Sequence, residues 1–117
     1  KVTIDIEDIL DGKASTDITS LPSEVMHIVI SNLVSQLTKL FKTEETKLVK
    51  HTKLANACKW LIGVAKYRSE YASMAFQDLS SNCSEIGMVI ALDEDFIAMC
   101  PELDTFYSEN KIIYTPD

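Results

Sequence analysis

Glycine, proline and cysteine are all scarce in this chain of 117 residues, which contains three of each. Loops that bind phosphates or dinucleotides need clustered glycines, whereas Gly12, Gly63 and Gly87 lie far apart in the sequence. Little glycine and proline together with 46% hydrophobic residues is typical of a globular domain and not of a disordered segment. We therefore expect residues 1–117 to form one folded domain that binds no cofactor.

Cysteine is also present in a pattern that excludes two kinds of site. Cys58, Cys83 and Cys100 are odd in number and share no repeated spacing, which indicates free thiols in a reducing compartment and not a disulfide framework. No cysteine or histidine pair has a zinc-binding spacing, so we predict no metal site. His51 precedes Cys58 by about 10 Å along a helix, too far to activate the thiol. We predict no catalytic residues and expect the chain not to be an enzyme.

Long hydrophobic runs are missing as well. No stretch approaches the roughly 18 to 20 apolar residues of a membrane-spanning helix, and no basic start followed by an apolar run marks a secretory signal. We expect an intracellular protein, cytoplasmic or nuclear, that does not bind a membrane. Because the chain begins at Lys1 and not at Met, we also expect it to be a fragment of a larger protein.

The distribution of charge is the most informative feature that is present. Residues 39–68 contain eight basic side chains and two acidic ones, residues 1–38 contain two lysines and six acids, and residues 69–117 contain one lysine and ten acids. A net charge of -7 therefore conceals a basic middle segment between acidic ends. Such a separation of charge favours docking to a charged protein partner or self-association.

Helical periodicity dominates residues 21–107, which we expect to form the helical core. Apolar residues recur at spacings of three and four through residues 26–41 and predict a well-buried helix, with Ile28 and Val34 widening its apolar stripe. A second helical pattern, capped by Thr43, runs to about residue 79 and predicts two helices, or one bent helix, with a break near His51 or Gly63. Shorter helices are expected near residues 85–92 and 101–107.

The two ends of the chain carry weaker patterns. Val2, Ile4 and Ile6 alternate with polar residues and predict a short strand within the strand-and-loop lead-in of residues 1–20, with a helical turn running to Leu10 as the alternative. Ile112 and Ile113 predict a second strand within the tail of residues 108–117. The predicted fold is therefore mainly α: a single-domain bundle of four or five helices, with short terminal strands that can pair with each other.

Five residues of the second helical segment are predicted to bind a partner. Trp60, Tyr67 and Tyr71 project from a side next to its apolar stripe, and clusters of exposed aromatic residues often mark interfaces. Lys59 and Lys66 fall together on one side of the helix, where they would form the rim. The alternative is that the helix is central and other elements cover these aromatic residues.

The function that we predict is a non-enzymatic protein-interaction or assembly domain, whose partner is another protein or a second copy of the chain in a homodimer. One alternative is a nucleic-acid-associated module that uses the basic segment 39–68. Against it, the lysines surround the helix, with Lys50 and Arg68 on a different side from Lys59 and Lys66, instead of forming one stripe. A second alternative is part of an enzyme whose site lies outside this fragment.

Overall fold

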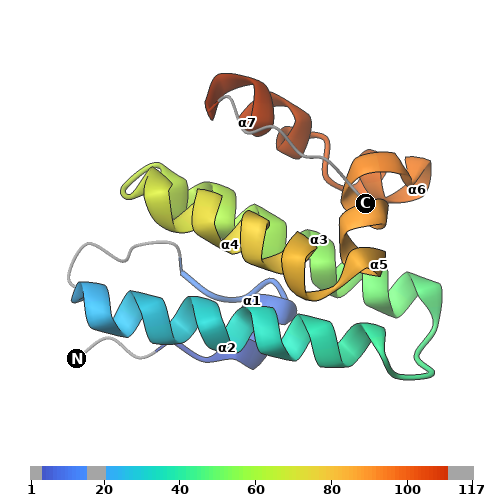
Figure 1. The fold of residues 1–117 in the computed structure, drawn as a ribbon, viewed down its shortest axis with the longest axis horizontal. Coiled ribbons are helices and arrows are strands. Elements are labelled where there is room, and N and C mark those ends of the chain that lie inside the picture. Colours follow the sequence, from blue (N-terminus) through green and yellow to red (C-terminus); the bar gives the residue numbers. More distant parts are fainter. Residues whose placement is uncertain (1–3, 16–20, 111–117) are drawn as a thin grey trace.

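Seven helices follow one another through residues 4–15 and 21–110, the parts of the chain that the computed structural model describes. No strand occurs in these residues. The mainly helical class is thus confirmed, whereas the predicted count of four or five helices is wrong, because it leaves out two short helices, near Ile9 and near Phe96. The helices are α1 (Ile6–Leu10), α2 (Ser23–Phe41), α3 (Lys47–Ala65), α4 (Ser69–Asn82), α5 (Ser84–Leu92), α6 (Glu94–Met99) and α7 (Glu102–Asn110) (Figure 1).

The predicted N-terminal strand is wrong from Ile6 onward, where the chain forms α1. The Asp5 carboxylate accepts a hydrogen bond from the Glu7 backbone N–H at 2.9 Å and so caps the helix. Ile9 and Leu10 are both buried, which adjacent residues of a half-exposed strand could not be, because their side chains would point to opposite faces. The predicted strand around Ile112, and hence its pairing, lies outside the described residues.

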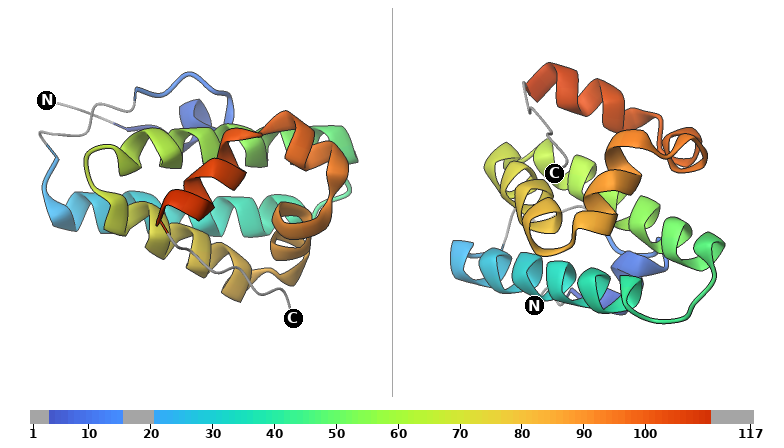
Figure 2. Two further views of the ribbon diagram at one scale, coloured as in Figure 1. Left: turned by 90° about the horizontal axis from the view of Figure 1, so that it is seen from above. Right: turned by 45° about the vertical axis from the view of Figure 1, so that its right-hand side comes forward.

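Helix α3 is the centre of the fold. It contacts α1, α2, α4, α6 and α7. In Figure 1, α3 and α4 lie side by side between α2 below and the α6–α7 segment above, and Figure 2 shows α7 lying across this pair. Because neighbours surround α3, its buried residues are not confined to one stripe: they are His51, Leu54, Ala55, Ala57, Cys58, Trp60, Leu61 and Val64.

The amphipathic helix predicted for residues 26–41 is confirmed as α2. Met26, Leu33 and Leu37 have no exposed surface, and α2 packs on α3 and α4. The expectation that Ile28 widens the buried stripe is wrong, since its side chain is 60% exposed. Helix α2 lies on the outside of the bundle, so only one of its faces is covered.

The break within the second helical segment falls later than predicted. Helix α3 ends at Ala65, and the backbone N–H groups of Tyr67 and Arg68 both bond to the carbonyl oxygen of Val64, at 2.9 and 3.0 Å. Two helices are therefore present, but the turn is at neither His51 nor Gly63. The turn brings α4 back alongside α3, and this packing could not be read from the periodicity of one helix.

The burial of Leu33 and Leu37 predicts the stability of the core. Replacing either residue by alanine should lower the free energy of unfolding by about 2 to 5 kcal/mol, because each substitution leaves a cavity in a packed interior. Ile28→Ala on the exposed side of α2 should change it by less than about 0.5 kcal/mol. Urea unfolding followed by circular dichroism measures both, and equal effects of the Leu33 and Ile28 variants would contradict this packing.

Candidate partner-binding surfaces

Trp60 is buried, with 4% of its surface exposed. Its indole Nε1–H donates a hydrogen bond to the Ser15 carbonyl oxygen at 2.9 Å, so that the segment following α1 is attached to α3. A buried indole with a satisfied N–H acts as a structural residue of its own domain. The expectation that Trp60 is exposed is therefore wrong.

Tyr71 and Tyr67 lie at the turn between α3 and α4 but differ in exposure. Tyr71 is 6% exposed, its ring meets the His27 ring edge-on at 5.4 Å, and the Arg68 guanidinium lies 5.6 Å from its centroid. Tyr67, in contrast, is 52% exposed. Of the three aromatic residues predicted to bind a partner, Tyr67 is thus the one that the fold leaves accessible.

Lys59 and Lys66 are both exposed and line one groove, as their shared side of the helix predicted. The groove lies between α3 and α7 and has a volume of about 650 Å³. Glu102 and Glu109, both exposed, come from α7 and line it as well. The groove thus combines a pair of cations from one helix with a pair of anions from the other, and its remaining lining residues are Ile62, Gly63, Ala65, Thr105 and Phe106.

Aromatic packing fixes α7 beside α3 and α4. The rings of Phe106 and Tyr107 lie 5.6 and 5.5 Å from the ring of Phe76 in α4. Phe76 is 1% exposed, so α7 is held to the fully buried core and not to a surface side chain. Glu102 and Glu109 lie four residues before and three residues after Phe106, on the same side of α7, and all three line the groove.

Glu102 and Glu109 were not among the residues predicted from the sequence. They are seven residues apart, as are Lys59 and Lys66, and each pair therefore falls on one side of its helix about 10 Å apart. The equal spacing is visible in the sequence. The two pairs line the same groove because α7 packs against α3. This packing was not predicted from the sequence.

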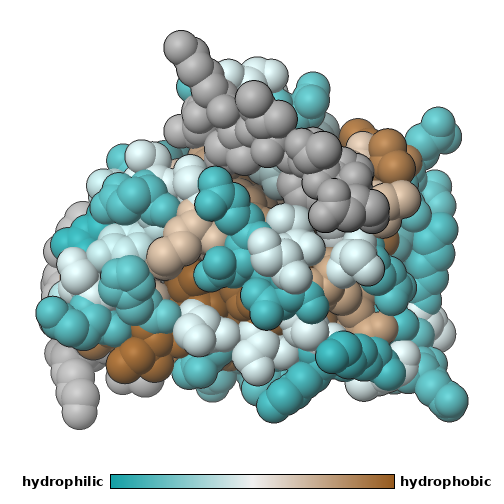
Figure 3. All heavy atoms as spheres, viewed as in Figure 1, coloured by the Kyte–Doolittle hydropathy of each residue, from teal (hydrophilic) through white to brown (hydrophobic). Residues whose placement is uncertain are grey.

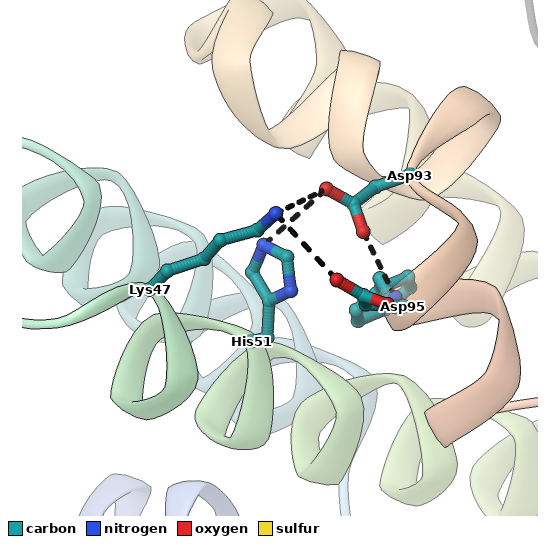
Figure 4. Close-up of polar contacts among 5 residues, drawn as sticks. Lys47, His51, Asp93 and Asp95 are labelled. Atoms are coloured by element: carbon teal, nitrogen blue, oxygen red, sulfur yellow. Dashed lines mark hydrogen bonds and ion pairs between the residues drawn. The ribbon is translucent and has the colours of Figure 1, made fainter.

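A second charged cluster joins the start of α3 to the start of α6 (Figure 4). One carboxylate oxygen of Asp93 lies 3.3 Å from the Lys47 ammonium and 3.9 Å from His51 Nε2, and the other accepts the Phe96 backbone N–H at 3.0 Å. That N–H and the Lys47 ammonium lower the pKa of Asp93. Asp93 therefore caps α6 and binds α3 at the same time.

The three cysteines are free thiols. Cys58 and Cys100 are buried. Burial is the main cause that raises the pKa of Cys100, the nearby Glu102 carboxylate is the second, and the pKa reaches about 11. Burial also raises the pKa of Cys58, with Cys100 and Glu102 adding to the effect. Both thiols are therefore protonated at neutral pH and are poor nucleophiles.

Neither a metal-binding cluster nor a membrane-spanning helix is present in the described part of the chain. Residues 4–15 and 21–110 contain no group of three or more metal-binding side chains arranged to hold an ion. Within the same ranges, no helix combines the length and the apolar character that crossing a membrane requires. Comparisons of the chain with models of known protein families, with curated proteins and with solved structures give no match.

The Asp93 cluster predicts a pH dependence of stability. Its pKa is lower in the folded chain, so the carboxylate adds stability above its unfolded pKa of about 3.9, and this contribution is lost as pH falls through the lower folded value. Asp93→Asn retains a capping side chain but removes the charge. Its melting temperature should be below that of the wild type at neutral pH, and the difference should shrink below about pH 4.

The control is Asp95→Asn, because Asp95 lies 3.7 Å from the same ammonium but is 81% exposed. A pair this exposed contributes little to stability, so the variant should melt close to the wild type at every pH. Thermal unfolding followed by circular dichroism from pH 2.5 to 7 measures both variants. Indistinguishable curves for the two would contradict the role assigned to Asp93.

Proposed function

We propose that this chain is a non-enzymatic protein-interaction domain of an intracellular protein and that it self-associates through the groove between α3 and α7. The observation that supports this proposal is the arrangement of charge in the groove. Lys59 and Lys66 line it from α3, and Glu102 and Glu109 line it from α7 at the same spacing. A surface with equally spaced charges of opposite sign on two edges is complementary to itself.

Symmetry explains why a second copy fits. In a two-fold dimer the same patch of both subunits forms the interface. If the axis runs along the groove, the lysine edge of each copy faces the glutamate edge of the other, and every charge meets its opposite. An axis across the groove would place like charges together, which is unfavourable. The charges therefore select one orientation of the dimer.

The apolar lining residues would supply the contact area between the charged edges. Ile62 and Ala65 are partly exposed in the groove, while Phe106 lies at its base. Tyr67 follows Lys66 directly in the sequence and is an exposed aromatic residue, although it does not line the groove. Because exposed ion pairs contribute at most about 1 kcal/mol each, we expect weak association, with the charges deciding orientation and rate more than affinity.

The nucleic-acid alternative is less well supported by the distribution of charge over the fold. Lys39 and Lys42 line a groove between α2 and α4 together with Asp78. Lys47 lies within 4 Å of two aspartates, and the lysines of the α3–α7 groove share it with two glutamates. A polyanion needs an uninterrupted row of cations, and the acids interrupt it at each of these places.

Charge reversal tests the dimer. Lys59→Glu with Lys66→Glu makes all four groove charges negative, and Glu102→Lys with Glu109→Lys makes all four positive. Each double variant should self-associate at least about tenfold more weakly than the wild type by sedimentation equilibrium at low salt. An equimolar mixture of the two should associate again, because every pair across the two-fold axis then has opposite signs.

The variant with all four reversals is the matched control, because it exchanges the two edges and keeps the net charge of -7. It should associate as well as the wild type. Both double variants remain net negative, so their association in the mixture cannot come from overall attraction. A wild type that stays monomeric at millimolar concentration, or a mixture no more associated than its components, would contradict the proposal.

A further inference from the structure

A second exposed surface lies on α5 and α6, away from the groove. Met88 and Leu92 of α5 are 42% and 60% exposed, and Ile97 of α6 is 41% exposed. Figure 3 shows apolar side chains gathering over α6 at the upper right of the molecule. Large apolar side chains gathered on the surface of a small domain often mark a binding site.

The position of these residues on their helices is not a consequence of core packing. The buried side of α5 is formed by Ile86, Val89 and Ile90, which already anchor the helix to the bundle. Met88 and Leu92 are four residues apart and so form an apolar ridge on the other side of α5. In α6, Phe96 is the residue inserted into the core, while Ile97 faces outward.

Acidic side chains accompany two of these apolar residues, Met88 and Ile97. Glu85 precedes Met88 by three residues on α5, and Glu94 precedes Ile97 by three residues on α6, so each acid lies one turn before an apolar residue on the same side. Both acids are exposed, as is Asp95. Residues 69–110 contain nine acids and no lysine or arginine. The nearest cation that the structure places here is Lys47, at the edge formed by Asp93 and Asp95.

We propose that Met88, Leu92 and Ile97 form one acidic apolar face with Glu85, Glu94 and Asp95, and that this face binds a basic amphipathic helix of a partner protein. Charge complementarity selects this partner. The apolar residues require an apolar stripe, and the surrounding carboxylates require lysine or arginine along its edges. A second copy of the chain that binds at the groove would leave this face uncovered, because the two surfaces share no residue.

A synthetic peptide is the appropriate probe. An 18-residue peptide with leucines at helical spacing and lysines on both edges, labelled with a fluorophore, is titrated with the full chain and followed by anisotropy. Met88→Ser with Leu92→Ser should raise its Kd by about tenfold or more, since the variant removes the apolar ridge. Both residues are exposed, so the melting temperature should change little.

The chain offers a closely matched control in Val25→Ser with Ile28→Ser. These α2 residues are 38% and 60% exposed, nearly the same as the α5 pair, and they should leave the Kd unchanged within about twofold. Two peptides complete the design: a scrambled one of identical composition without the stripe, and one with glutamate in place of lysine. Both should bind at least about tenfold more weakly.

The outcomes separate the proposal from general attraction between unlike charges. Equal binding of the scrambled peptide, or equal effects of the α5 and α2 variants, would overturn it. The variant with all four groove charges reversed keeps the net charge of -7 and leaves this face unchanged, so it should bind the basic peptide as the wild type does. If the domain binds this peptide but stays monomeric, the proposal for the acidic apolar face stands and the proposed dimer is rejected.

Discussion

The burial of α3 is the constraint on which the rest of the structure depends. Five other helices contact it. Two long-range hydrogen bonds of 2.9 Å attach α1 and the segment after it to α3: Asn56 donates to the Leu10 carbonyl at the end of α1, and Trp60 donates to the Ser15 carbonyl. The turn after α1 passes so close to α3 that a Cβ atom on Gly12, which has a φ of 76°, would lie 3.3 Å from the Asn56 side chain. With so much of α3 covered, a partner can reach only the part left open beside α7 and the surfaces of the outer helices.

Folding brings basic and acidic side chains that are far apart in the sequence close together in space. The basic segment 39–68 forms the end of α2 and all of α3, and the acidic residues that follow form α4 to α7, which pack on those helices. Lys47 consequently meets Asp93, and Lys59 shares a groove with Glu102. Much of the separation seen in the sequence is therefore complementarity within one molecule. What remains unbalanced is α5 and α6, because Lys47 is the cation that contacts their acids in the described part of the chain.

The helices that the sequence predicted well are those that expose one face. Helix α2 is an outer helix of the bundle with one covered face, so the spacing of its apolar residues matches the residues that are buried. Leu33 and Leu37 are buried, as this spacing predicted. Helix α3 has no comparable stripe because it is covered on several sides, and its C-terminal turn was accordingly misplaced. A strand was preferred to a helical turn for the segment that forms α1, because five residues are too few to separate the two periods; Asp5 caps the helix that forms.

The candidate surfaces differ in what a sequence can reveal about them. Lys59 and Lys66 were identified because they lie on one helix, whereas their acidic counterparts come from α7, whose place is set by packing of Phe106 and Tyr107 on Phe76. Trp60 of α3 and Tyr71 of α4 are buried, as the alternative of a covered helix had it, and their burial depends on elements distant in the sequence. The groove carries charges of both signs, so the groove of a second copy is complementary to it. The face on α5 and α6 carries only negative charge, so two copies of that face would repel each other. Self-association through the groove would therefore leave that face free, and a basic partner could bind to the assembled domain without competing for the same residues.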